Sequence, residues 1–245
     1  MFPHEKLNVY GKALAFVADT SAWVKGWDKR HAVVEQFARA SESLVLNLAE
    51  GARLRPGRAK LRALDYALGS GLECAACLDI AGIKGFLEES SIVHQKGRLC
   101  EVTKMLIGLG KVWESWRIQE DSAPYVAKSS ARPRQPLFHH ETLEVYGVAL
   151  DVMRWITQLP GGQDLRSRFH RQVDEGATSI ALDIAEGNGR YCELDHRRFL
   201  DMACAAAVKV AAELDLATRK ATFEMAACER GKVLLERIVA MLSRM

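Results

Sequence analysis

The stretch Asn47-Leu48-Ala49-Glu50-Gly51 returns, nearly unchanged, as Asp183-Ile184-Ala185-Glu186-Gly187, about 136 residues later. When the chain is shifted against itself by that offset, about a third of the aligned positions are identical, well above chance. Repeats of solenoid proteins span roughly 20–50 residues, so this longer period indicates two copies of one domain. Other matched pairs are Leu7/Leu143, Val9/Val145, Tyr10/Tyr146, Gln36/Gln172, Ser43/Ser179, Asp65/Asp201 and Asp79/Asp215.

Both copies carry alanine and leucine at helical spacing and lack the alternating β-branched runs of strands, which predicts an all-α fold. Four amphipathic helices on short loops bury their apolar faces only against each other, so we expect two tandem up-down-up-down four-helix bundles. The predicted helices are 6–25, 29–51, 57–82 and 89–117 in the first copy, and 141–158, 164–187, 192–220 and 222–243 in the second.

Proline marks the division between the copies. Pro124, Pro133 and Pro136 fall in one stretch, which is typical of a linker. We therefore assign residues 1–118 to the first bundle, 119–140 to a linker and 141–245 to the second bundle. His139 and His140 lie at the end of this linker, where we expect them to be solvated.

Composition favours a globular protein of the cytoplasm. The net charge is only +3, no long apolar run resembles a membrane span, and the polar start does not resemble a signal peptide. The six cysteines do not recur at the repeat offset, which favours reduced thiols over a disulfide framework.

The repeated pentapeptide forms part of a polar row. Ser43, Asn47 and Glu50 are spaced to share one helix face, and Ser179, Asp183 and Glu186 repeat that arrangement. We expect Gly51 and Gly187 to end their helices with positive φ, and Glu50 and Glu186 to lock the corner that follows. A ligand or nucleic-acid contact and a catalytic carboxylate are the alternative interpretations of the two glutamates.

A basic segment follows each pentapeptide. It predicts contacts to the phosphates of nucleic acid, with a solvated surface turn as the alternative. The candidate binding residues are Arg53, Arg55, Arg58, Lys60 and Arg62 in the first copy, and Arg190, Arg197 and Arg198 in the second.

Two patterns that resemble metal sites are incomplete. Cys74-x-x-Cys77 has no second cysteine pair at finger spacing, so we expect two core thiols. Glu193-x-x-His196 matches a helical di-iron motif only once, where such bundles need two pairs and two further glutamates. We therefore expect no metal and no other cofactor.

The order Gln…Ser…Asn-x-Ala-Glu-Gly followed by a basic segment and Ala-x-Gly-Ser-x-x-Glu resembles the bacterial four helix bundle proteins, or 23S ribosomal RNA intervening-sequence proteins. The accessory variability determinant of diversity-generating retroelements is similar to them. The first copy carries the pattern as Gln36, Ser43, Asn47, Ala49, Glu50, Gly51, Ala67, Gly69, Ser70 and Glu73. The resemblance implies a non-enzymatic bundle that forms ring-like homo-oligomers, pentamers in the family, binds nucleic acid, and in the retroelement case binds a reverse transcriptase.

Together these features predict a non-enzymatic, oligomerising adaptor that binds RNA or DNA through its basic corners, with a reverse transcriptase as a candidate partner. A protein–protein scaffold without nucleic-acid binding is the first alternative. A metal-dependent four-helix-bundle enzyme, resting on Glu193 and His196, is the remote one.

Overall fold

The computed structural model describes residues 2–115, 136–220 and 223–245, and within these ranges every regular element is helical. The first repeat forms η1 (Pro3–Lys6), α1 (Asn8–Gly26), α2 (Ala32–Arg53), α3 (Arg58–Ile83) and α4 (Glu89–Ser115). The second forms η2 (His139–Thr142), α5 (Glu144–Gln158), α6 (Arg168–Gly187), α7 (Glu193–Arg219) and α8 (Met225–Leu242).

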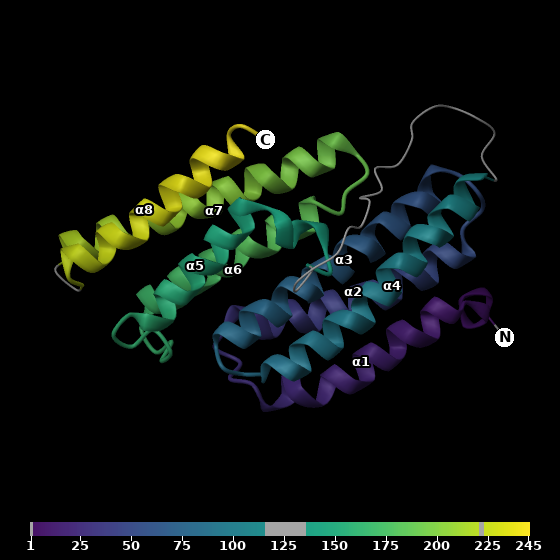
Figure 1. Ribbon diagram of the computed structural model, residues 1–245, viewed down its shortest axis with the longest axis horizontal. Helices are drawn as coiled ribbons and strands as arrows, with labels where there is room; N and C mark the ends of the chain where they lie inside the picture. The colour runs from purple at the N-terminus through teal and green to yellow at the C-terminus, as the bar shows by residue number, and fades with distance from the viewer. Residues whose placement is uncertain (1, 116–135, 221–222) are drawn as a thin grey trace.

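Each repeat is a four-helix bundle. Consecutive helices pack side by side. The first helix of each set also packs against the last, α1 against α4 and α5 against α8, which closes α1–α4 and α5–α8 into separate bundles (Figure 1). The two cores are continuous with one another and hold the apolar faces of the helices. The prediction of an all-α fold built from helical bundles is therefore confirmed.

The central helix of the first bundle is α3, which is mostly buried. Its residues include Ala67, Gly71, Cys74, Ala75 and Cys77, whose small side chains let neighbouring helices approach closely. Within the described residues, α3 is also the one helix long and apolar enough to cross a membrane, a property it shares with core helices of globular proteins.

The glycine of the pentapeptide has a different role from the predicted one. Helix α2 continues through Gly51 to Arg53, and Gly51 and Gly187 do not have positive φ. A Cβ at Gly51 would lie 3.1 Å from the Trp113 ring, and one at Gly187 would lie 2.8 Å from Cβ of Phe199. Helix α6 does end at Gly187, as predicted, but without a positive φ, and at both glycines a neighbouring helix leaves little room for a side chain.

The predicted linker lies mostly outside the described residues, in 116–135. Its last residues belong to the second bundle instead, because His139–Thr142 form η2, the counterpart of η1. The expectation of two solvated histidines was wrong for His140, which is fully buried between Phe138 and Tyr146. His139 is exposed, and its ring lies 3.1 Å from Asn188.

The bundles lie side by side, with α3 and α2 of the first facing α6 and α5 of the second (Figure 1). This contact, which we call the junction, positions every candidate site described below. Helices α1 and α8 lie on the outer sides of the molecule, whereas α4 and α7 border the junction through side chains such as Lys96 and Phe199.

Candidate nucleic-acid interface

Five of the predicted basic residues are exposed and unpaired. Among the residues that the structure describes, none of these five arginines has a carboxylate within salt-bridge distance; they are Arg53, Arg55, Arg58, Arg62 and Arg198. Arg197 is also exposed, but it pairs with Glu193 at 3.2 Å. An unpaired surface guanidinium is available to a phosphate group without first breaking an ion pair.

Lys60 was predicted to bind nucleic acid, but the structure buries its side chain. Only 4% of it is exposed, and its ammonium donates to the carbonyl oxygens of Gly51 (2.9 Å) and Leu54 (3.0 Å) while lying over the Trp113 ring. It thereby satisfies carbonyls at the end of α2 that have no helical partner. Lys60 closes the α2–α3 corner from inside and is not available to nucleic acid.

Arg190 is the second predicted binding residue whose side chain the structure buries. Its side chain is buried in the junction, where it pairs with Glu186 and lies 3.5 Å from Asp65 of the first bundle. The guanidinium also lies over the rings of Tyr66 and Phe199, at 4.9 and 4.8 Å. Arg190 therefore fastens the α6–α7 corner to α3 and does not reach solvent.

This contact brings the basic segments of the two repeats together. The Arg62 guanidinium lies 5.8 Å from the centre of the Tyr66 ring, which is one helical turn further along α3, and Arg198 directly precedes Phe199. Arg198 is close enough to lower the pKa of Glu186, although burial, the larger effect, raises that pKa. The first turns of α3 and α7, with their unpaired arginines, thus border one surface.

The polar row of the pentapeptide differs between the repeats. Asn47 donates to the carbonyl and hydroxyl oxygens of Ser43 (2.8 and 2.9 Å), and Ser43 bonds Ser70 on α3 at 2.8 Å. Glu50 is exposed and has no hydrogen bond or ion pair within the described ranges, so Lys60, not Glu50, holds its corner. In the second repeat Glu186 does hold the corner, through Arg190.

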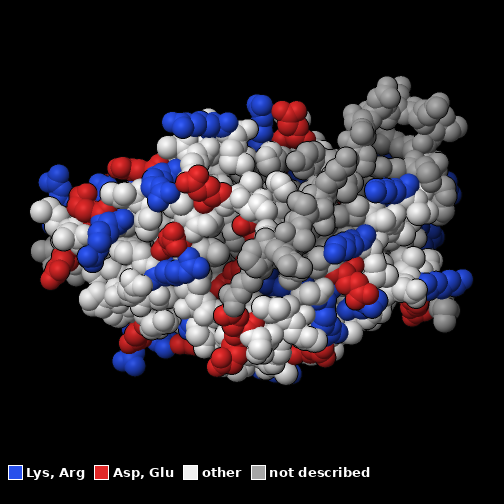
Figure 2. Space-filling model, viewed as in Figure 1, with Lys and Arg blue, Asp and Glu red and all other residues white. Residues whose placement is uncertain are grey.

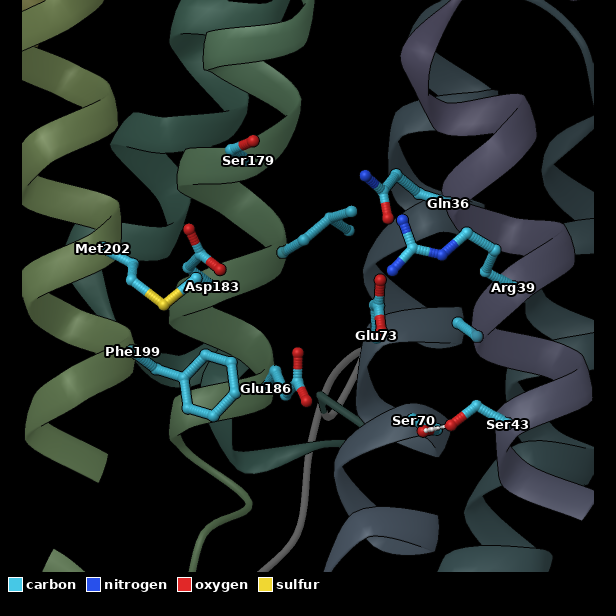
Figure 3. A pocket seen from close by; sticks show the side chains of 12 residues that line it. Gln36, Arg39, Ser43, Ser70, Glu73, Ser179, Asp183, Glu186, Phe199 and Met202 are labelled. Atoms are coloured by element: carbon cyan, nitrogen blue, oxygen red, sulfur yellow. Dashed lines mark hydrogen bonds between the residues drawn. The ribbon is translucent and has the colours of Figure 1, made fainter. Parts of the chain in front are cut away.

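A cavity of about 370 Å³ lies in the junction, between α2 and α3 on one side and α6 and α7 on the other. Ser43 from the polar row of the first repeat and Ser179, Asp183 and Glu186 from that of the second face it, as Figure 3 shows, together with Arg39 and Glu73 (Figure 3). Its lining residues are Gln36, Arg39, Ala40, Ser43, Ser70, Glu73, Ser179, Leu182, Asp183, Glu186, Phe199 and Met202.

The carboxylates in this cavity are perturbed. Burial, reinforced by the charge of Glu186, raises the pKa of Glu73 to about 8 and that of Asp183 to about 7. Desolvation disfavours the charged form of an acid, and a neighbouring negative charge adds to that effect. Near neutral pH the cavity therefore holds protonated carboxyl groups as well as ionised ones.

A second polar cluster lies at the junction beside η2. Tyr146 of α5 donates to Asp79 of α3 at 2.9 Å, and Lys96 of α4 pairs with Asp79 at 2.7 Å and with Glu141. Ligand atoms of Asp79, His140 and Glu141 lie within 4.8 Å of one another, as a metal site requires. The ammonium of Lys96 already pairs with both carboxylates and offsets one of their two negative charges.

A buried ion pair closes the far end of the junction. Lys84, which directly follows α3, pairs with Asp174 of α6, and both side chains are almost completely buried. Asp174 also accepts a hydrogen bond from the backbone of Ala32 at 3.0 Å, which ties the start of α2 to α6. The sequence offered no signal for this pair, because Ala38 stands at the position equivalent to Asp174.

The two incomplete metal motifs are engaged in other contacts. Cys74 and Cys77 are fully buried core thiols, and burial raises the pKa of both. Glu193 pairs with Arg197, while the His196 ring lies 2.8 Å from the carbonyl oxygen of Gly187. The structure therefore does not bring Glu193 and His196 together at one site.

Comparison with known proteins gives one family. Residues 5–108, which are most of the first bundle, match the model of the 23S rRNA-intervening sequence protein family. No curated protein and no solved structure matches the chain.

Proposed function

Because residues 5–108 match the model of the 23S rRNA-intervening sequence protein family, we propose that this chain is a non-enzymatic adaptor that binds the phosphate backbone of RNA or DNA. The observation that carries the proposal is a set of exposed arginines, which we call the basic surface: Arg53, Arg55, Arg58 and Arg62 at the α2–α3 corner and the start of α3, and Arg198 near the start of α7. These arginines come from both repeats and have no carboxylate partners in the described part of the chain.

The chemistry of the basic surface suits backbone contacts better than base reading. Guanidinium groups match the geometry of phosphate oxygens, and contacts to phosphates carry no sequence information. Two helices also begin at this surface, α3 at Arg58 and α7 at Glu193, and free backbone amides at helix starts favour anions. Binding is therefore expected to be largely independent of sequence and sensitive to salt.

The proposal is tested by fluorescence anisotropy with labelled single- and double-stranded RNA and DNA at low salt. We expect all to bind, and we expect replacement of Arg53, Arg55, Arg58 and Arg62 by alanine to weaken binding at least about tenfold. A control variant replaces Lys25, Lys29, Lys104 and Arg230, which are exposed elsewhere, so that its net charge is the same. No binding by the wild type, or an equal loss in the control, would refute the proposal.

The alternative is a protein–protein scaffold, and one observation favours it. On the face drawn in Figure 2, Lys and Arg are interspersed with Asp and Glu, and no large area of one sign is present (Figure 2). A scaffold would retain its protein partners after nuclease treatment. An adaptor would release the protein partners that it holds through the nucleic acid. A reverse transcriptase is the partner that we would test first.

A further inference from the structure

The described part of the chain contains three buried histidines, and one of them has no hydrogen-bond partner there. The His31 ring lies 3.1 Å from the Lys84 ammonium, and the His170 ring lies 2.6 Å from the Ser167 hydroxyl. His140 is completely buried, and neither of its ring nitrogens makes a hydrogen bond. A buried polar group without a partner is costly and uncommon, and an ion that binds it is one physical reason to keep it.

Two carboxylates lie close to the His140 ring. Asp79, His140 and Glu141 each place one ligand atom within 4.8 Å of the others. Bonds from a metal ion to imidazole nitrogen or carboxylate oxygen are about 2.0–2.2 Å long, so two ligands of one ion lie up to roughly 4.4 Å apart. Small adjustments of the three side chains therefore bring them onto one ion. We call these residues, together with Lys96, the η2 cluster.

The two carboxylates present one oxygen each to the same position. The hydroxyl of Tyr146 donates to Oδ2 of Asp79, and the backbone N–H of Phe138 donates to Oε2 of Glu141 at 3.2 Å. The other oxygens, Oδ1 and Oε1, both contact the Lys96 ammonium. Hydrogen bonds of this kind orient the carboxylates that hold metal ions in proteins. The η2 cluster thus has a position for a cation, with its carboxylate ligands held in place by their neighbours.

Lys96 fills this position incompletely. Its single positive charge offsets one of the two carboxylates, and it makes no hydrogen bond to His140 among the described residues. The buried pair of Lys84 and Asp174 differs in both respects, because one cation meets one carboxylate there and also reaches His31. A divalent cation in the η2 cluster balances both carboxylates and gives the imidazole nitrogen a partner.

The η2 cluster is open to solvent on one side. The Asp79 and Glu141 side chains are 19% and 13% exposed, and that of Lys96 is 10% exposed. An ion can therefore enter, while the long, flexible Lys96 side chain can carry its ammonium outward. One imidazole and two carboxylates form a mixed nitrogen and oxygen donor set. Such a set suits Zn²⁺ and other first-row transition metals, whereas Mg²⁺ and Ca²⁺ prefer oxygen ligands alone.

We propose that His140, Asp79 and Glu141 bind one divalent transition-metal ion, which replaces the Lys96 ammonium between the two carboxylates. Asp79 belongs to α3 of the first repeat, whereas His140 and Glu141 belong to η2 of the second, so the bound ion fastens the two repeats together. The sequence predicted no metal, because ligands that come from two repeats have no local spacing that reveals them.

The inference does not depend on nucleic-acid binding, so it is tested on full-length protein freed of nucleic acid and metal. The probe is Zn²⁺, and competition with a chromogenic chelator measures how many ions bind and how tightly. His140→Leu removes the nitrogen ligand and needs no hydrogen bond, so it is expected to fold and to bind Zn²⁺ at least about tenfold more weakly. His4→Leu is the matched control, because His4 is the equivalent residue of the first repeat and lies outside the η2 cluster.

A second pair of variants tests the carboxylate of α3. Asp79→Asn is expected to weaken Zn²⁺ binding at least about tenfold, whereas Asp215→Asn, at the equivalent position and also beside a lysine, leaves it unchanged. Lys96→Met removes the competing ammonium and is expected to tighten Zn²⁺ binding at least about tenfold. An excess of Mg²⁺ of about a hundredfold is expected not to displace the Zn²⁺.

Thermal unfolding gives an independent readout. Zn²⁺ is expected to raise the unfolding midpoint of the wild type and of His4→Leu but not of His140→Leu, since an ion that binds only the folded protein stabilises it. If circular dichroism shows that His140→Leu is unfolded, Asp79→Asn decides. The inference is overturned if the wild type binds no Zn²⁺, if a folded His140→Leu or Asp79→Asn binds it as tightly as the wild type, or if Lys96→Met binds it no more tightly. It is equally overturned if Mg²⁺ displaces the ion.

Discussion

Tyr146 of the second bundle donates a hydrogen bond from its hydroxyl to the carboxylate of Asp79 in the first bundle. The two oxygen atoms lie 2.9 Å apart in the junction. The equivalent Tyr10 lies beside His4 on an outer face, and among the described residues the second bundle does not pack against it. The same residue in the same local structure therefore has two environments. This difference provides internal controls for several of the predictions below.

The Tyr146→Phe variant removes the bond to Asp79 and leaves the rest of the ring in place. We expect the free energy of unfolding to fall by about 1–2 kcal/mol, because the buried Asp79 carboxylate loses one partner. The matched control is Tyr10→Phe, which should change stability by less than about 0.5 kcal/mol in dilute protein. Urea unfolding measures both, and equal effects would contradict the assigned contact.

Glu73 makes stability dependent on pH. Its pKa is raised from 4.5 to about 8 in the folded protein, so the folded state binds the proton more tightly than the unfolded state. The resulting stability is fully present below pH 4.5 and is lost as pH rises through 8. Glu73→Gln cannot ionise, so at pH 8.5 it should be more stable than the wild type by at least about 2 kcal/mol.

The gain in Glu73→Gln should shrink toward zero as pH falls below 4.5, where Glu73 becomes protonated in both the folded and the unfolded state. Glu42→Gln, at an exposed position, is the control and should show no such trend. Thermal unfolding across this pH range measures the difference. A gain that is the same at every pH would contradict a buried, protonated Glu73.

Lys60 is predicted to contribute to folding and not to binding. Lys60→Met retains the packing on Trp113 but leaves the carbonyl oxygens of Gly51 and Leu54 without their donor. We expect a loss of about 1–3 kcal/mol in stability. Arg58→Met, at an exposed position two residues earlier, should cost less than about 0.5 kcal/mol in stability but should weaken nucleic-acid binding. The opposite pattern would place Lys60 at the interface.

Gly187 is predicted to be intolerant of a side chain. An added Cβ would lie 2.8 Å from Cβ of Phe199, so Gly187→Ala must push α6 and α7 apart and should cost about 1–3 kcal/mol. Gly97, in α4, has no atom within 4 Å of an added Cβ. Gly97→Ala should therefore stabilise the protein by about 0.5–1 kcal/mol, because glycine is unfavourable inside a helix. Thermal unfolding of both variants tests the assignment.

The helices could be predicted from sequence because their apolar spacing and breaks are local properties. The role of Gly51 could not be predicted, because two different requirements select glycine: the close approach of Trp113 from α4, and a positive φ. Lys60 and Arg190 looked like their exposed neighbours because sequence does not show which cation lies under a ring or beside a carboxylate. The recurrence of Tyr10 as Tyr146 was visible, but only the structure shows which of the two is covered.

The most direct test of the basic surface is the dependence of nucleic-acid affinity on salt. For double-stranded DNA, the slope of log K against log salt concentration changes by about 0.9 for each phosphate contact. Replacing Arg53, Arg55, Arg58 and Arg62 by alanine should make the wild-type slope shallower by about 2–4, whereas the charge-matched control should leave it unchanged. An identical slope in the wild type and the four-arginine variant would contradict the account.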